Sequence, residues 1–186
     1  MSLHALVCII PDASSFREMS LALRLSHDLL LYHRLDVQII LESDALGMME
    51  TNSFPSGNII YIGHPSATFV RTNLNKKETS FEIRNSSLVL CGHVLDDPSI
   101  GNVPSCACMV DIVCKPYYPA AVFLHPHPQD SERKKSIMLF MLVNSTTALE
   151  RAGRLFPIRT GIATPSWVVS SHLADKFGAA GICGAG

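Results

Sequence analysis

Short apolar runs alternate with amphipathic stretches along most of this chain, and this alternation constrains its fold more than any other feature. Runs rich in valine, isoleucine and leucine predict strands at 4–10, 36–41, 59–62, 136–143 and 167–170. Apolar residues at helical spacing predict helices at 14–32, 43–49, 67–74, 148–156 and 172–177. Strands joined through helices are typical of a parallel sheet with helices on its faces. The sequence therefore predicts one α/β domain over residues 1–186.

The finer expectation is a doubly wound, mainly parallel sheet in three layers, of the flavodoxin or Rossmann type. The segment 136–143 is the most apolar run, so we expect it at the centre of the sheet. The runs 81–83 and 88–90 flank a turn and predict a hairpin at the sheet edge. Residues 181–186 read as the opening of a last, truncated strand.

Composition and charge exclude several classes of protein. The chain has 186 residues, of which 47% are hydrophobic and 17% charged, which is the composition of a folded domain. Its formal net charge is -1 and it has no basic stripe, so we expect no nucleic-acid partner. No apolar run is long enough to span a bilayer, and the first ten residues lack the pattern of a signal peptide. We therefore expect no membrane partner.

Residues 102–121 interrupt the alternation. This segment is rich in cysteine and proline and has neither helical nor strand periodicity, so we interpret it as an irregular insertion. One interpretation is a zinc site, because thiolate and imidazole groups suit that metal. The candidate ligands are Cys106, Cys108, Cys114, His125 and His127.

Two alternatives to the metal site stay open. The insertion can be a surface loop, or it can be a translated intron, because its removal joins Gly101 smoothly to Val122. We prefer the intron to the metal, since the cysteine spacing matches no common zinc knuckle. The irregular spacing of the six cysteines also gives no evidence for a disulfide framework.

The strongest candidate for catalytic chemistry lies between Gly63 and Ser66. No Gly-x-Ser-x-Gly pentapeptide occurs, so the chain lacks the usual nucleophile elbow of a serine hydrolase. Ser66 as nucleophile with His64 as base is a weak candidate, because residues two apart rarely align their side chains. The alternative is that Ser66 caps the following helix and His64 is a loop residue. Either way, this turn ends a predicted strand at the edge where open α/β sheets bind ligands.

Several segments resemble a known family. They are 9–12, 22–36, 57–63 and above all 148–168, which reads ALERAGRLFPIRTGIATPSWV. These segments resemble the C-terminal α/β region of large fungal prolyl-oligopeptidase-like proteins, which belong to the serine peptidases of the α/β-hydrolase class. The likeness covers most of the chain outside 102–121. It implies a fragment or truncated gene product whose relatives carry their catalytic elbow elsewhere and often enter the secretory route.

The resemblance implies a noncatalytic accessory region whose partner is the remainder of a larger hydrolase polypeptide. No catalytic residue and no cofactor can be assigned through it. The first alternative is a standalone small-molecule-binding or hydrolytic domain that uses the edge from Gly63 to Ser66. A further alternative is an unstable truncated product, because an unfinished sheet leaves an unpaired edge. Substrate and oligomeric state are not determined by the sequence.

Overall fold

The computed structural model of the chain describes residues 7–12, 16–55, 57–74, 80–85, 87–90, 92–95, 120–128, 136–156, 165–171, 173–177 and 182–186. The helices in these residues are α1 (Phe16–His33), α2 (Glu42–Glu50), α3 (Thr68–Leu74), α4 (Thr146–Leu155) and α5 (Leu173–Phe177). The strands of the larger sheet are β1 (Val7–Pro11), β2 (Val37–Ile39), β3 (Asn58–Gly63), β7 (Ala120–Pro126), β8 (Ile137–Val143), β9 (Trp167–Ser170) and β10 (Ile182–Ala185). The smaller sheet contains β4 (Phe81–Arg84), β5 (Ser87–Leu90) and β6 (His93–Val94).

The larger sheet is mixed, which confirms the α/β class but corrects the expectation of a mainly parallel sheet. Its strand order is β10-β9-β7-β8-β3-β1-β2. The pairs β1 with β2, β1 with β3 and β3 with β8 are parallel. The pairs β7 with β8, β7 with β9 and β9 with β10 are antiparallel. The parallel half, from β8 to β2, contains the strands that alternate with helices along the sequence. The antiparallel half begins at β7, which pairs with β8.

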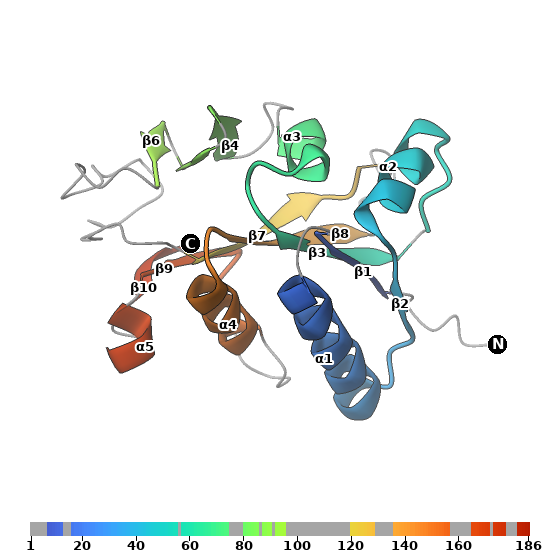
Figure 1. Cartoon of the computed structure of the whole chain (residues 1–186), viewed down its shortest axis with the longest axis horizontal. Coiled ribbons are helices and arrows are strands. Elements are labelled where there is room, and N and C mark those ends of the chain that lie inside the picture. The colour runs from blue at the N-terminus through green and yellow to red at the C-terminus, as the bar shows by residue number, and fades with distance from the viewer. Residues whose placement is uncertain are drawn as a thin grey trace.

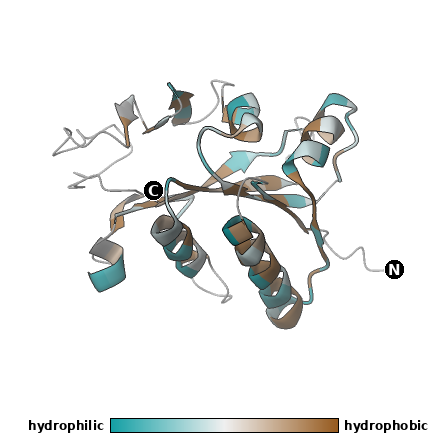
Figure 2. Cartoon of the chain, in the orientation of Figure 1, coloured by the Kyte–Doolittle hydropathy of each residue, from teal (hydrophilic) through white to brown (hydrophobic). Residues whose placement is uncertain are grey.

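Helices lie on both faces of the sheet. Figure 1 shows α1, α4 and α5 on one face and α2, α3 and the smaller sheet on the other. Alternate residues of β1 serve the two sides: Cys8 and Ile10 join the core under α2 and α3, whereas Val7 and Ile9 join the core under α1 and α4. A sheet buried on both faces explains why its strands read as unbroken apolar runs. The brown ribbon along the sheet in Figure 2 shows this pattern.

The predicted hairpin forms, but it does not extend the edge of the main sheet. Strands β4 and β5 pair antiparallel, with β6 added to β5, in a separate three-stranded sheet. This sheet packs on the larger one through Phe81, whose ring stacks on Phe123 of β7 with centroids 3.9 Å apart. The expected edge hairpin is therefore wrong in its placement, because the apolar side of β4 is buried against rings of the main sheet.

The boundary of the insertion also needs correction. Residues 102–119 lie outside the described residues, so the interpretation of their structure stays untested. Ala120 and Ala121, which we assigned to the insertion, are buried residues of β7 and pair with Val143 and Leu142 of β8. An excision that ended at 121 would therefore remove the first two residues of an internal strand.

A continuous set of aromatic rings connects the smaller sheet, the larger sheet and α3. Neighbouring ring centroids lie between 3.9 and 6.3 Å apart. Such contacts stabilise by about 0.5 to 1.5 kcal/mol each beyond their buried area. In order, the rings are Phe81, Phe123, Phe140, Tyr61, Phe69 and Phe54. Among the described residues, no helix has the length and apolar character needed to cross a membrane.

Candidate functional site

The candidate site lies where the connections of β1 and β3 diverge. Strand β2 lies on one side of β1 and β3 on the other, so the two loops that follow β1 and β3 start side by side. The helix after β1 is on one face of the sheet and the helix after β3 is on the other (Figure 1). A divergence of this kind opens the edge of a sheet to ligands in many α/β proteins. Asp12 ends the β1 side, and Gly63 to Ser66 form the β3 side.

His64 and Ser66 contact each other within one tight turn. The Nδ1 atom of His64 lies 2.7 Å from Oγ of Ser66 and also accepts the backbone N–H of Ser66 at 3.1 Å. Because the amide donates to Nδ1, this nitrogen carries the lone pair and the Ser66 hydroxyl donates its proton to it. The sequence analysis expected such contacts to be rare between residues two apart, and here the two side chains do come within hydrogen-bonding distance. The backbone turn itself brings the two side chains together.

Ser66 does not take the expected role of capping α3. Its hydroxyl bonds the His64 ring, and the amide of Phe69 in the first turn of α3 donates instead to Oε1 of Glu42 at 3.0 Å. Glu42 begins α2, so a carboxylate from one helix stabilises the start of the next. Because Glu42 accepts the N–H of Phe69, the Ser66 hydroxyl is not needed at the start of α3 and bonds His64 instead.

Asp12 and Gly63 fix the base of the turn. The backbone N–H of Asp12 donates to the carbonyl of Ile62 at 2.8 Å, and the carboxylate of Asp12 lies 3.5 Å from the backbone nitrogen of His64. A Cβ atom added at Gly63 would lie 2.6 Å from Cβ of Asp12 and 2.8 Å from the hydroxyl of Tyr61. The close approach of β1 and β3 therefore requires glycine at this position.

The hydroxyl of Tyr61 lies beneath the turn. Tyr61 is fully buried, and its ring stacks on Phe69 at a centroid distance of 5.0 Å. Burial raises the pKa of its phenol far above the ordinary value, and the carboxylates of Glu42, Asp12 and Glu18 raise it further. Within the described residues, this hydroxyl has no hydrogen-bond partner. Tyr61 is thus a neutral group held under the site without access to solvent.

Three backbone N–H groups at the turn form hydrogen bonds within the protein. A serine nucleophile needs free N–H groups aimed at the developing oxyanion. The N–H of Ser66 bonds Nδ1 of His64, that of Ala67 bonds the carbonyl of His64 at 3.1 Å, and that of Phe69 bonds Glu42. Within the described residues, Nε2 of His64 has no carboxylate partner to orient it. In the described part of the chain, the turn thus places a hydroxyl beside a base, while the N–H groups of Ser66, Ala67 and Phe69 are bonded within the protein.

The proposed zinc ligands are only partly placed. Cys106, Cys108 and Cys114 lie outside the described residues. His125 and His127 are buried, and their rings meet Phe140 and Phe54 edge to face. In the described part of the chain, no cluster of three or more His, Cys, Asp or Glu side chains could hold a metal. The two rings pack against aromatic side chains, and the zinc hypothesis itself stays untested because its three cysteines lie outside the described residues.

The cysteines reveal one feature that the sequence reasoning missed. Cys183 in β10 is disulfide-bonded, whereas Cys8 in β1 is a free buried thiol. Burial raises the pKa of the Cys8 thiol to about 11, so it stays protonated and unreactive at neutral pH. Irregular spacing along the chain carried no signal for the bond at Cys183, because pairing depends on proximity in space.

Two surface hollows occur on the face that carries α1 and α4. One, of about 440 Å³, lies between these two helices beside Phe16, Arg17 and Thr146. The other, of about 450 Å³, has an almost wholly apolar lining and lies against β3, β7 and β8, with Asn58 and Ser166 as its polar residues. Neither hollow is lined by His64 or Ser66. The candidate turn and the larger hollows are therefore separate features of the surface.

No protein-family model, curated protein or solved structure matches the chain.

Proposed function

We propose that this chain is a noncatalytic accessory region of a serine hydrolase resembling the prolyl oligopeptidases, and that it packs against the catalytic region of such a protein. The observation that carries the proposal is the closed turn from His64 to Ser66. Its backbone amides bond to groups of the protein itself, so they are not available to a substrate. The resemblance of segment 148–168 supplies the hydrolase context.

The hydrogen bonds of the turn favour a structural role for it. Loss of a single oxyanion donor typically lowers kcat by about 100- to 1000-fold, and here the N–H groups of Ser66, Ala67 and Phe69 are bonded within the protein. A substrate could use these N–H groups only if the hydrogen bonds that hold the connection between β3 and α3 were broken. The Ser66 hydroxyl and the His64 ring are better explained as groups that stabilise this connection.

A second candidate function is hydrolysis of a small ester or amide at the same edge. The 2.7 Å contact between Ser66 and His64 favours it, because Nδ1 could accept the hydroxyl proton as Oγ bonds to the substrate carbonyl carbon. The imidazolium would then give this proton to the leaving group as its bond to the carbonyl carbon breaks, and water would hydrolyse the resulting acyl-serine to release the acid and restore Ser66. The two functions make opposite predictions for the isolated chain.

Steady-state assays of the purified chain with nitrophenyl esters and a proline-containing peptide amide separate them. The proposal predicts no turnover above that of the Ser66→Ala variant. Turnover that disappears in both Ser66→Ala and His64→Gln would establish the second function. The accessory role itself predicts that the chain co-elutes with the catalytic region of a prolyl-oligopeptidase-like protein from the same organism, and separate elution at micromolar concentration would contradict that role.

A further inference from the structure

The tip of the smaller sheet carries the acceptor pattern for N-linked glycosylation. Asn85, Ser86 and Ser87 form the triplet Asn-x-Ser, in which the middle residue is not proline. An oligosaccharide transferase selects this pattern, which supplies an asparagine amide and a hydroxyl two residues later. Three matching residues also arise by chance, so the use of the triplet depends on its place in the fold and on the compartment in which the chain folds.

Asn85 lies in the tight loop between β4 and β5. Arg84 and Ser87 pair across the hairpin, which leaves two residues to connect the strands. Asn85 is exposed and has a φ of 51°. A two-residue hairpin loop needs a positive φ at its first residue, and asparagine adopts this conformation more readily than most residues. The fold therefore places the acceptor amide in a surface loop, where a glycan can be attached.

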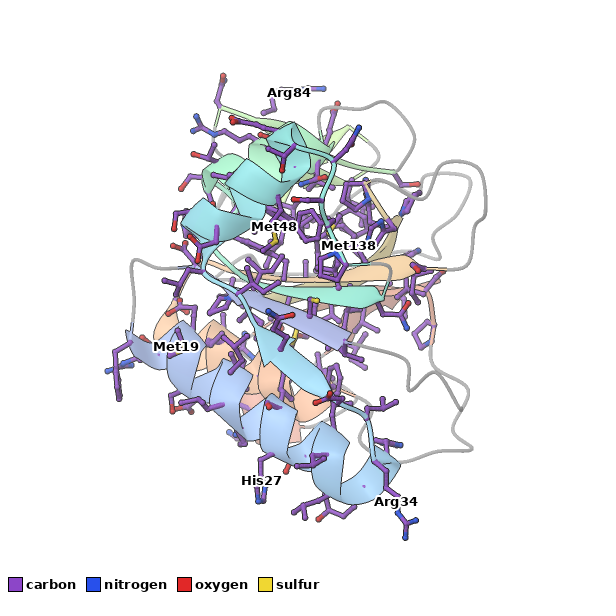
Figure 3. All side chains as sticks on the ribbon, turned by 90° about the vertical axis from the view of Figure 1, so that its right-hand side faces the viewer. Met19, His27, Arg34, Met48, Arg84 and Met138 are labelled. Carbon is purple, nitrogen blue, oxygen red and sulfur yellow. The ribbon has the colours of Figure 1, made fainter. Side chains whose placement is uncertain are left out.

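The neighbours of Asn85 on β4 are charged and solvated. Figure 3 shows Arg84, the residue before Asn85, at the end of the molecule opposite α1. The Arg84 side chain is 56% exposed and pairs at 2.6 Å with Glu82, which is 45% exposed. The apolar side of the hairpin is instead buried against the larger sheet through Phe81. An oligosaccharide on Asn85 would thus extend into solvent without displacing a packed side chain.

A second triplet of the same pattern offers a comparison within the chain. Asn144, Ser145 and Thr146 connect β8 to α4. Asn144 is half-buried, and Oγ of Ser145 accepts the N–H of Ala148 at 3.2 Å to cap the helix. Thr146 is the first residue of α4 and lines the hollow between α1 and α4. This triplet belongs to a packed connection, so a bulky group fits there less well than at Asn85.

The disulfide at Cys183 independently indicates the compartment. Cys183 lies in β10 and is buried as well as disulfide-bonded. Structural disulfides form and persist in oxidising surroundings such as the lumen of the endoplasmic reticulum, and they are rare in the cytosol. Acceptor asparagines carry glycans in proteins that pass through the same surroundings. The chain therefore contains a bond that requires the conditions under which Asn85 would meet the transferase.

We propose that Asn85 is an N-glycosylation site, modified in an oxidising secretory compartment. In the transfer, Nδ2 of Asn85 forms a bond to the anomeric carbon of a lipid-pyrophosphate-linked oligosaccharide. The bond between that carbon and the pyrophosphate oxygen breaks, and the lipid pyrophosphate leaves with its electron pair. The amide nitrogen gives up one proton to a base of the transferase.

This inference goes beyond the proposed accessory function and does not rest on it. A glycan is bulky and hydrophilic, so it would keep the tip of the β4–β5 hairpin out of any protein interface. Packing against a catalytic region would then use another surface of the chain. Absence of the glycan would leave the accessory function standing, and separate elution from the catalytic region would leave the glycosylation site standing.

Peptide mapping of the chain isolated from the cells that produce it tests the proposal. Peptide N-glycosidase in water enriched in heavy oxygen converts a glycosylated asparagine into labelled aspartate, so mass spectrometry identifies the occupied position. We expect the label at residue 85. An unlabelled residue 85 overturns the proposal, whether or not residue 144 is labelled.

Variants of the chain, secreted from eukaryotic cells behind a cleavable leader, test whether the triplet itself is used. Asn85→Asp removes the acceptor amide but keeps a residue that tolerates positive φ, so loss of the glycan would not reflect loss of the turn. Ser87→Ala should also abolish the glycan at residue 85, and Ser87→Thr should retain it. Asn144→Asp is the matched control and should retain it as well. A glycan at residue 85 that survives Ser87→Ala, or that Asn144→Asp removes, contradicts the assignment.

Discussion

Replacement of Gly63 by alanine tests whether the edge between β1 and β3 is closed. The added Cβ would lie 2.6 Å from Cβ of Asp12 and 2.8 Å from the Tyr61 hydroxyl, whereas ordinary carbon contacts lie near 3.5 to 4.0 Å. Neither neighbour can move easily, because Cβ of Asp12 is fixed to the β1 backbone and the Tyr61 ring is stacked on Phe69. The two strands must therefore separate where their ladder ends.

The expected cost combines overpacking with a weakened backbone hydrogen bond. Overpacking in a well-packed core costs about 1 to 3 kcal/mol. The bond from the Asp12 N–H to the Ile62 carbonyl, 2.8 Å long, contributes about 1 kcal/mol. We expect Gly63→Ala to lower the free energy of unfolding by about 2 to 3 kcal/mol, which lowers the melting temperature by about 4 to 12 °C for a domain of this size.

Gly47→Ala is the matched control. Gly47 lies inside α2, and an added Cβ meets no heavy atom within 4 Å. We expect this variant to raise stability by about 0.5 to 1 kcal/mol, since alanine favours the helix. Urea titration followed by Trp167, which is the single tryptophan, measures both variants. A Gly63→Ala protein as stable as the parent would refute the closed edge, because it would mean that space for a ligand exists above Tyr61.

Three other results follow from buried groups. Asp175→Asn should lower the free energy of unfolding in urea titration by about 2 to 3 kcal/mol, because it removes the carboxylate bonded at 2.6 Å to the buried Arg151. Arg154→Met removes an exposed contact to the same carboxylate and should lower it by less than about 1 kcal/mol. Equal losses in the two variants would contradict this assignment. Tyr61→Phe should leave stability unchanged or raise it by about 1 kcal/mol, since it removes a buried hydroxyl without a partner among the described residues, and a clear loss would indicate a bonded hydroxyl. The pKa of Cys8 is raised from 9.0 to about 11 on folding, so stability from this thiol is complete below pH 9 and is lost as the pH rises toward 11, by at most about 1.4 kcal/mol per pH unit. The melting temperature should therefore fall less steeply between pH 8 and 10 in Cys8→Ala than in the parent chain. Parallel pH profiles of the two proteins would contradict the raised pKa of Cys8.

Local pattern predicted the elements well where burial follows a simple period. Strand β8 was expected at the centre of the sheet and lies between β7 and β3. Helix α1 ends at His33, within a residue of its predicted end. The apolar residues of these two elements follow the periodicity of a buried strand or helix, so the sequence alone indicates them.

Strand β7 was not predicted, because its sequence lacks the usual pattern of a strand. Two prolines and two histidines follow Phe123, and the cysteine-rich segment before it obscured the start. The usable signal was the alternation in which Phe123 and His125 face one core while Leu124 and Pro126 lie exposed. Without β7, neither the antiparallel half of the sheet nor the separate placement of the hairpin could be derived.

The position of the candidate site in the fold could be predicted from the sequence, but its geometry could not. Gly63 to Ser66 was identified as the edge of the sheet because a turn follows an apolar run. The partners were not predictable, since Glu42 reaches α3 from another helix and Asp12 contacts the turn from β1. Such contacts depend on the packing of elements that lie far apart in the chain.

Covalent labelling of the purified chain by a fluorophosphonate, read by intact mass, tests most directly whether this region lacks a catalytic serine. The account predicts no adduct on the folded protein and identical spectra for the parent and Ser66→Ala. A single phosphonyl adduct on the parent that is absent from Ser66→Ala would contradict it.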